Sequence, residues 1–179
     1  MPEEPRKGEL RRLPPGSHGI PADVVARNQR ERLIAAMAEV CAEKGYAGAS
    51  VAEVAKRAGV SSVTFYEQFA DKQDCMLAAH RQLLGRLLEA LDEVDAPLGA
   101  LLGLLAADPP SARLLTVEIL AVGPEGVKRH DAMVEAVAEC LQTDWIRAAG
   151  ALALIGKLAM AGEAERLPEL EEGLARNLS

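Results

Sequence analysis

Three of the five aromatic side chains in this chain of 179 residues lie within five consecutive positions. They are Phe65, Tyr66 and Phe69, in the stretch RAGVSSVTFYEQFADK over residues 57–72. If residues 61–69 form a helix, a rotation of about 100° per residue puts both phenylalanines on one face and the tyrosine outside it. The hydroxyl of an exposed tyrosine can donate to a phosphate oxygen. The spacing therefore indicates a short helix. The two phenylalanine rings would anchor it to the rest of the protein, and the tyrosine would contact a polyanion.

The residues before this cluster have the spacing of a helix-turn-helix. Ala55 is small where two helices would cross, Gly59 permits a turn, and Phe65 anchors the second helix. The N-terminal residues of such a second helix can enter a major groove about 12 Å wide. Lys72 lies at the expected start of the next helix, where its ammonium and the free N–H groups would bind a phosphate. Three short helices in an ordinary small core, with Tyr66 half buried, would have the same spacing.

Composition and periodicity predict an all-α protein of about nine helices. Ala, Leu, Glu and Arg are abundant, aromatic and β-branched residues are sparse, and no long alternating pattern suggests a strand. Ser50, Ser61, Asp71 and Asp144 are suitable helix N-caps. The expected helices cover approximately residues 27–44, 51–58, 62–69, 72–94, 97–107, 111–122, 125–141, 145–162 and 167–178.

The helix pattern divides the chain into three parts. Residues 1–26, with five prolines, are expected to form a flexible basic arm. Residues 27–75 are expected to form a three-helix domain that contains the helix-turn-helix. Residues 76–179 are expected to form a second, helical domain.

Charge is unevenly distributed along the chain. The net charge is −7, but residues 1–80 contain 11 basic and 11 acidic side chains, so the excess acid lies after them. The acidity therefore does not exclude a nucleic-acid partner for the first half. Basic residues of the arm could reach adjacent phosphates or a minor groove, and an arm that only faces water fits equally well. These residues are Arg6, Lys7, Arg11 and Arg12.

The sequence offers little material for catalysis. It contains three histidines and lacks the di-iron, zinc, P-loop and nucleophile-elbow motifs, so we expect no enzyme, no metal site and no cofactor. Cys41, Cys75 and Cys140 are widely spaced, as expected of reduced thiols in a cytoplasmic protein. No apolar stretch reaches the ~20 residues of a membrane span, and the charged N-terminus is unlike a secretory signal.

The ordered motifs over residues 30–80 resemble the TetR family of transcriptional regulators. They comprise EKGY at 43–46, SVAEVA at 50–55, AGVS at 58–61 and TFY at 64–66, followed by Phe69 and Lys72. The resemblance implies a homodimer that binds a palindromic DNA operator, with one recognition helix in each half-site, and that usually represses. Carried over by position, the DNA-facing residues are Arg27, Arg30, Ser50, Ser62, Val63, Thr64, Tyr66 and Lys72. Val63 stands where the family very often has glycine, and it can touch a thymine methyl or restrict approach.

The resemblance also implies that residues 76–179 bind a small effector, which moves the fourth helix and separates the recognition helices. This region is rich in Leu, Ala and Val, so we expect an apolar or amphipathic effector. Candidate effector contacts are His80, Glu118, His130, Met133 and Trp145. These residues also have ordinary structural explanations. His80 could be a hydrogen-bonded core histidine, Glu118 could pair with an arginine, and Trp145 could be a plain core side chain.

The eighth and ninth helices are expected to form the dimer surface. Ala149, Ala153 and Gly156 are small enough to let helices approach closely, and leucines stripe the ninth helix. The competing function is that of a helical interaction protein without DNA affinity.

Overall fold

The computed structural model describes residues 21–178, so most of the predicted arm, with its four basic side chains, lies outside the described residues. The described chain is helical throughout and contains no strand, as predicted. Its elements are α1 Ala22–Gly48, α2 Val51–Ala58, α3 Ser62–Gln68, α4 Lys72–Asp92, α5 Pro97–Ala107, α6 Pro109–Thr116, η1 Glu118–Val122, α7 Pro124–Cys140, α8 Trp145–Ala161, η2 Ala164–Leu170 and α9 Glu171–Leu178.

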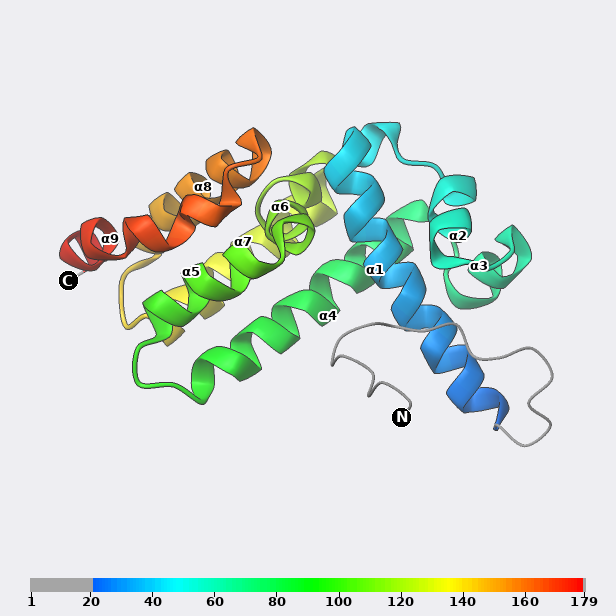
Figure 1. Cartoon of the computed structure of the whole chain (residues 1–179), viewed down its shortest axis with the longest axis horizontal. Coiled ribbons are helices and arrows are strands. Elements are labelled where there is room, and N and C mark those ends of the chain that lie inside the picture. Colours follow the sequence, from blue (N-terminus) through cyan, green and yellow to red (C-terminus); the bar gives the residue numbers. More distant parts are fainter. Residues whose placement is uncertain (1–20, 179) are drawn as a thin grey trace, which may run out of the picture.

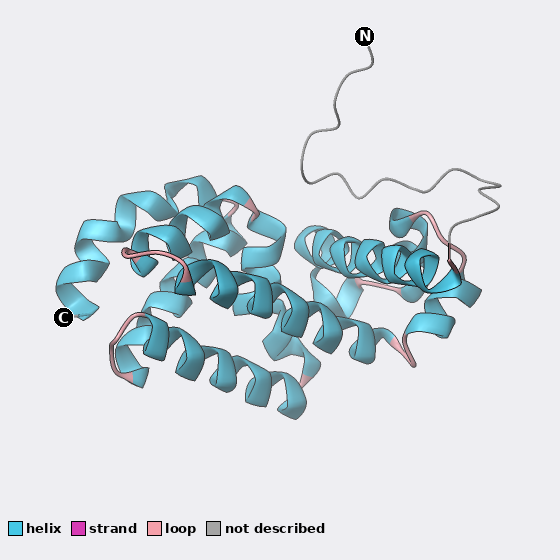
Figure 2. Cartoon of the chain, turned by 90° about the horizontal axis from the view of Figure 1, so that it is seen from below, coloured by secondary structure: helices cyan, strands magenta, loops and turns pink. Residues whose placement is uncertain are grey.

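Two groups of helices lie at opposite ends of the molecule. α2 and α3 lie beside α1 at one end, and α8 and α9 lie at the other (Figure 1). α4 leaves the first group and runs along the molecule toward α5. Seen from below, the chain is a set of helices joined by short loops (Figure 2). α1 also packs against α6, so the two groups are joined by more than α4.

Four predicted N-caps are confirmed, and each satisfies backbone N–H groups that the first helical turn leaves free. Ser50 accepts from the N–H of Glu53 in a full capping box, and Ser61 accepts from the N–H of Thr64. Asp71 and Asp144 accept in the same way at the starts of α4 and α8. Short polar side chains therefore set where these helices begin.

Helix α1 is longer than predicted at its N-terminus. It begins at Ala22, so residues 22–26 are helical and do not belong to a flexible arm. The carbonyl of Pro21 accepts from the N–H groups of Val24 and Val25, and Asp23 places a negative charge in the first turn. At the other end Gly45 has φ 72° and ψ 160°, which interrupts the helix where a stop was predicted.

Two helices that were predicted to be continuous are broken. The sixth helix breaks at Val117 (φ −125°, ψ −60°), and the chain continues as the 3-10 helix η1. The predicted ninth helix is divided into η2 and α9, with Pro168 inside η2, because proline cannot donate the backbone hydrogen bond that a continuous α-helix needs.

Apolar side chains form two clusters, one for each group of helices. The first joins α1–α4 and contains the fully buried Leu33, Met37 and Phe65. The second joins α4–α8 with η2 and contains Leu102 and Met133. The thiols of Cys41 and Cys75 are free and buried in the first cluster, and Cys140 is half-buried. Among residues 21–178, no helix is long and apolar enough to cross a membrane.

Candidate nucleic-acid interface and effector region

The turn between α2 and α3 has the geometry that the sequence predicted. Gly59 adopts the left-handed conformation, with φ 65° and ψ 37°, which a residue with a Cβ adopts only under strain. The N–H of Val60 then reaches back to the carbonyl of Ala55 at 3.0 Å. Ala55 is buried, so α3 can cross close to α2. The two short helices form one helix-turn-helix unit.

The faces of α3 separate the aromatic residues as predicted. Phe65 and Phe69 are fully buried, and their ring centroids lie 5.6 Å apart. Tyr66 is 59% exposed, and Val63 is 70% exposed. The Tyr66 ring meets the Phe65 ring edge to face at 5.5 Å, so it rests on a buried neighbour while its outer side stays open. Tyr66 is therefore not the half-buried core residue of the alternative interpretation.

The predicted DNA-facing hydroxyls differ in how free they are. Ser62 is exposed at the first position of α3. The Thr64 hydroxyl lies 3.1 Å from Ser61 Oγ. Ser50 Oγ accepts from the Glu53 N–H and donates to Glu53 Oε2 at 2.8 Å, so it is committed to capping α2. Ser62 is the hydroxyl with the most open position of the three.

Lys72 does not form the phosphate site that the sequence predicted. Its ammonium donates to the carbonyls of Tyr46 and Ala49 at 2.8 and 2.9 Å and lies 4.3 Å from the centre of the Tyr46 ring. At the start of α4 the N–H of Asp74 donates to the Asp71 carboxylate, and the Asp74 carboxylate accepts from the N–H of Ala70, which precedes the helix. The sequence could not show this because the carbonyls belong to residues 23 and 26 positions away.

The two arginines of the predicted set also differ. Arg27 is exposed on α1. Arg30 is half-buried, donates from Nη1 to the carbonyl of Gln68 at 2.7 Å, and lies over the Phe69 ring at 4.2 Å. One arginine is therefore open to solvent, and the other is bound to the end of α3.

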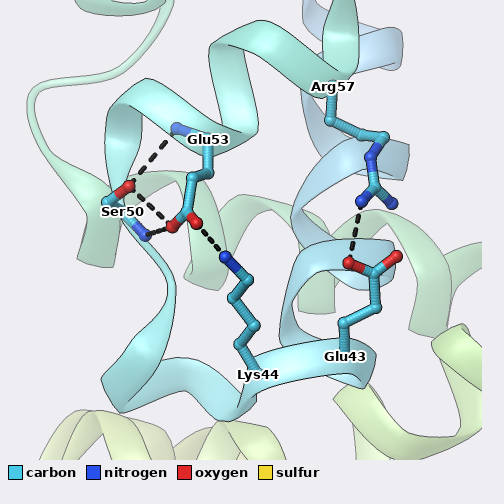
Figure 3. A network of polar contacts seen from close by, with 5 residues as sticks. All are labelled: Glu43, Lys44, Ser50, Glu53 and Arg57. Carbon is cyan, nitrogen blue, oxygen red and sulfur yellow. Dashed lines mark hydrogen bonds and ion pairs between the residues drawn. The ribbon is translucent and has the colours of Figure 1, made fainter.

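Ion pairs join α1 to α2 and escaped the sequence analysis. Arg57 binds Glu39 and Glu43 at 3.0 and 2.8 Å. Lys44 binds Glu53, and Figure 3 shows this pair together with the one between Arg57 and Glu43. The Lys44 ammonium and the Ser50 hydroxyl hold the pKa of Glu53 at about 2, well below its usual value of 4.5. The groups surround a surface hollow of about 390 Å³ between the helices. Their exposure makes each pair weak, so the network orients α2 more than it stabilises the fold.

Among the predicted effector contacts, His80 has the strongest structural support. It is 1% exposed, and its Nε2 has no hydrogen-bond partner among the described residues. Burial, together with the nearby His130 and Arg129, lowers the pKa of His80 to about 4. His130 is half-buried, and Met133 lies fully buried one turn further along α7. The three residues therefore bring one unsatisfied polar atom and an apolar surface together between α4 and α7.

Glu118 is a structural residue, as the alternative interpretation had it. It is 6% exposed, and its Oε1 accepts from Arg113 Nε at 2.8 Å. Its Oε2 accepts from the backbone N–H of Tyr46 at 2.7 Å. Both carboxylate oxygens are therefore occupied, and Glu118 is removed from the effector candidates.

Trp145 was also wrongly placed by the sequence analysis. It is the first residue of α8 and is 46% exposed, so it does not line the interior of the second domain. Gly156, predicted for the dimer surface, is instead buried, and a Cβ there would lie 3.1 Å from Thr116 Oγ1. Gly156 was predicted on the wrong face because the neighbours of a helix are not visible in its own periodicity.

Surface hollows lie away from the predicted effector contacts. One of about 350 Å³ lies between the start of α5, the end of α7 and α9, and one of about 250 Å³ lies between α1, α4 and α6. None of the five candidate residues lines these two hollows or the one between α1 and α2.

Comparison with known proteins identifies the helix-turn-helix. Residues 33–79 match the family model for bacterial regulatory proteins, tetR family. The HTH-type transcriptional regulator BetI of Stenotrophomonas maltophilia is 40% identical over 80 residues. Residues 33–79 therefore form a DNA-binding domain of the TetR family. Another relative is the fatty acid metabolism regulator protein of Bacillus subtilis, 36% identical over 62 residues.

The two alignments cover 45% and 35% of this chain, and only 41% and 32% of the relatives. Solved structures extend the likeness to nearly the whole fold. A transcriptional regulator from Rhodococcus, 28% identical, has a TM-score of 0.66 over 83% of this chain and 95% of its own. FadR from Bacillus subtilis in complex with stearoyl-CoA, 21% identical, has a TM-score of 0.66 over 83% and 96%. The second domain of this chain therefore has the fold of these regulators.

Proposed function

We propose that this protein is a sequence-specific DNA-binding transcriptional repressor of the TetR family, which binds a palindromic operator as a homodimer and is released by a small apolar effector. The observation that carries the proposal is the division of faces on α3. Phe65 and Phe69 are buried, whereas Val63 and Tyr66 are exposed. Val63 and Tyr66 lie three positions apart, so they are neighbours on the exposed side of the helix, and an exposed pair of this kind suits an interaction surface.

Recognition would use the N-terminal half of α3 in the major groove. The Val63 methyl groups are suited to contact with a thymine methyl, and the Ser62 hydroxyl to a base edge. The Tyr66 hydroxyl would donate to a backbone phosphate, and Arg27 would pair with another. Thr64 completes the outer face of the helix. Ser50, Arg30 and Lys72, whose polar atoms bind within the protein, would contribute indirectly.

Selection of bound duplexes from a random DNA pool tests this function. We expect a palindrome to be enriched, because a two-fold symmetric dimer reads two identical half-sites. Tyr66→Ala protein serves as the matched control and should enrich the same palindrome poorly. Recovery of no sequence by the wild-type protein would favour the competing function, a helical interaction protein without DNA affinity.

The dimer would form through the outward face of α8. Trp145, Ile146 and Met160 are 46%, 77% and 58% exposed, and Gly150 and Ala153 lie exposed between them. Ile146, Gly150, Ala153 and Met160 follow one another at intervals of four, three and seven positions and share one face of the helix, on which the exposed Lys157 also lies. A second copy of α8 is the natural occupant, because a symmetric pair would present two recognition units to a palindrome.

Sedimentation analysis tests the dimer. The wild-type protein should sediment as a dimer at micromolar concentration, and Ile146→Glu should sediment as a monomer. Val127→Glu places the same charge at an exposed apolar position of α7 and should leave the dimer intact. A wild-type monomer, or equal effects of the two substitutions, would contradict the proposed surface.

The effector would insert between α4 and α7 and place a polar group against His80. Nε2 of His80 needs a hydrogen-bond partner, and Met133 with its neighbours supplies an apolar wall. An amphipathic ligand with a hydrogen-bonding head and an apolar chain fits this combination. The stearoyl-CoA of the Bacillus subtilis FadR structure is such a molecule, so long-chain acyl compounds are the first class to test.

Release would follow if the effector binds the DNA-incompetent arrangement more tightly than the competent one. Titration of the protein–operator complex with stearoyl-CoA, stearate and a short-chain acid should show release by one long-chain compound. His80→Leu should weaken that release while it leaves operator affinity intact. If none of the compounds releases the operator, the proposed acyl effector is wrong, but the proposed DNA-binding function still stands.

A further inference from the structure

Arg30 connects the first helix to the end of the recognition helix. Its Nη1 donates to the carbonyl oxygen of Gln68 at 2.7 Å, and its guanidinium carbon lies 4.2 Å from the centre of the Phe69 ring. Gln68 is the last residue of α3, and Phe69 is its C-cap. The contact therefore crosses 38 positions of the sequence to reach one helix terminus.

The chemistry of this contact suits a fixed cation. The carbonyls of the last turn of a helix have no partner within the helix and carry partial negative charge, which a cation offsets. The face of a phenylalanine ring also attracts a guanidinium. None of the ion pairs among the described residues includes Arg30, so the end of α3 and the ring are the contacts that orient it.

The recognition helix needs such support because it is short. α3 has seven residues and would not form as an isolated helix. Phe65 and Phe69 anchor one face of it, but apolar contacts do not by themselves fix the rotation and tilt of a helix of about two turns. The N–H of Phe69 donates to Phe65 at 2.9 Å, so the carbonyl held by Arg30 lies beside the last hydrogen bond of the helix.

We propose that Arg30 is a positioning residue for DNA binding, which holds the C-terminal end of α3 against α1 and so sets the direction of Val63 and Tyr66. It acts through the protein and does not pair with a phosphate, in contrast to the assignment from the sequence. Arg27, one turn earlier on α1 and exposed, is the arginine available for a phosphate. The proposal rests on the proposed DNA-binding function.

The salt dependence of operator binding distinguishes the two roles. Each phosphate contact contributes about 0.9 to the slope of log affinity against log salt concentration. With the duplex selected by the wild-type protein, we expect Arg30→Met and Arg30→Lys each to weaken binding on the order of tenfold, with the wild-type slope. Lysine keeps the charge but lacks the planar fork, so it should not restore affinity. Arg27→Met, the matched control, removes one phosphate contact from each subunit of the dimer and should lower the slope by about 1.8.

Amide hydrogen exchange supplies a readout that does not use DNA. The Phe69 amide should exchange faster in both Arg30 variants than in the wild-type protein and should be unchanged in Arg27→Met. If Arg30→Met does not fold, Arg30→Lys carries the comparison. A slope lowered by about 1.8 in Arg30→Met, one contact from each subunit, and restored in Arg30→Lys would overturn the positioning role. A wild-type protein that binds no duplex would refute the proposed function. The exchange rates would then test only whether Arg30 holds the end of α3.

Discussion

The carboxylate of Glu118 accepts a hydrogen bond from the backbone N–H of Tyr46 at 2.7 Å, across 72 positions of the sequence. Arg113 completes the arrangement: its Nε donates to Glu118 at 2.8 Å, and its Nη1 donates to the carbonyl of Ala42 at 2.7 Å. The last turns of α1 are thus bound to the junction of α6 and η1. The DNA-binding unit and the second domain are joined there by a buried ion pair.

Glu118→Gln should destabilise the protein, because it leaves the half-buried Arg113 without its counter-charge. We expect the free energy of unfolding in urea to fall by about 2–4 kcal/mol. The control is Glu163→Gln, which removes a carboxylate from the exposed pair with Arg166 and should barely move the unfolding midpoint. Equal effects of the two substitutions would show that the pair with Arg113 does not hold the domains together.

Phe65 and Tyr66 are adjacent in the sequence, and their truncation should have opposite consequences. Phe65→Ala removes a fully buried ring and should lower the free energy of unfolding by about 3–5 kcal/mol. Tyr66→Ala should leave the unfolding curve nearly unchanged and weaken operator binding on the order of tenfold. Urea titration and fluorescence anisotropy with labelled operator measure the two effects. Unchanged operator affinity in Tyr66→Ala would contradict the assigned face of α3.

His80 should make stability depend on pH. Burial lowers its pKa in the folded protein from 6.5 to about 4. Below pH 6.5 the unfolded chain takes up a proton at His80 that the folded protein does not accept until about pH 4, so stability falls across this window. The loss is on the order of 3 kcal/mol. Urea unfolding measured between these pH values should show a flatter profile in His80→Leu, and parallel profiles would contradict the assignment.

Gly126 should not tolerate even one methyl group. A Cβ at this position would lie 2.0 Å from the carbonyl oxygen of Ile119 and 2.9 Å from Cβ of Val122. Gly126→Ala should therefore lower the free energy of unfolding by about 1–3 kcal/mol, since the clash is with backbone. Gly85→Ala, in α4 with open space around it, should raise the free energy of unfolding by about 0.5–1 kcal/mol. A comparison of urea midpoints tests both signs.

Features that depend on near neighbours in the chain could be predicted from the residues alone. Ser50, Ser61 and Asp71 cap helices because their side chains bond to an N–H three positions on. The inward faces of Phe65 and Phe69 follow from helical periodicity. The break in the predicted ninth helix follows from Pro168, which is visible in the sequence, whereas the break at Val117 has no proline or glycine to mark it.

The partners of charged side chains could not be predicted in this way. Arg30, Lys72 and Glu118 bind backbone groups 38, 26 and 72 positions away, and no rule of spacing joins such residues. Arg30 and Lys72 were expected to face DNA, and Glu118 was expected to contact an effector or to pair with an arginine. Folding brought each one to a backbone N–H or carbonyl near the end of a helix, where a buried polar atom is costly to leave unpaired. Local hydrogen bonding thus determines where the helices begin, whereas long-range packing determines which charges remain free to meet DNA.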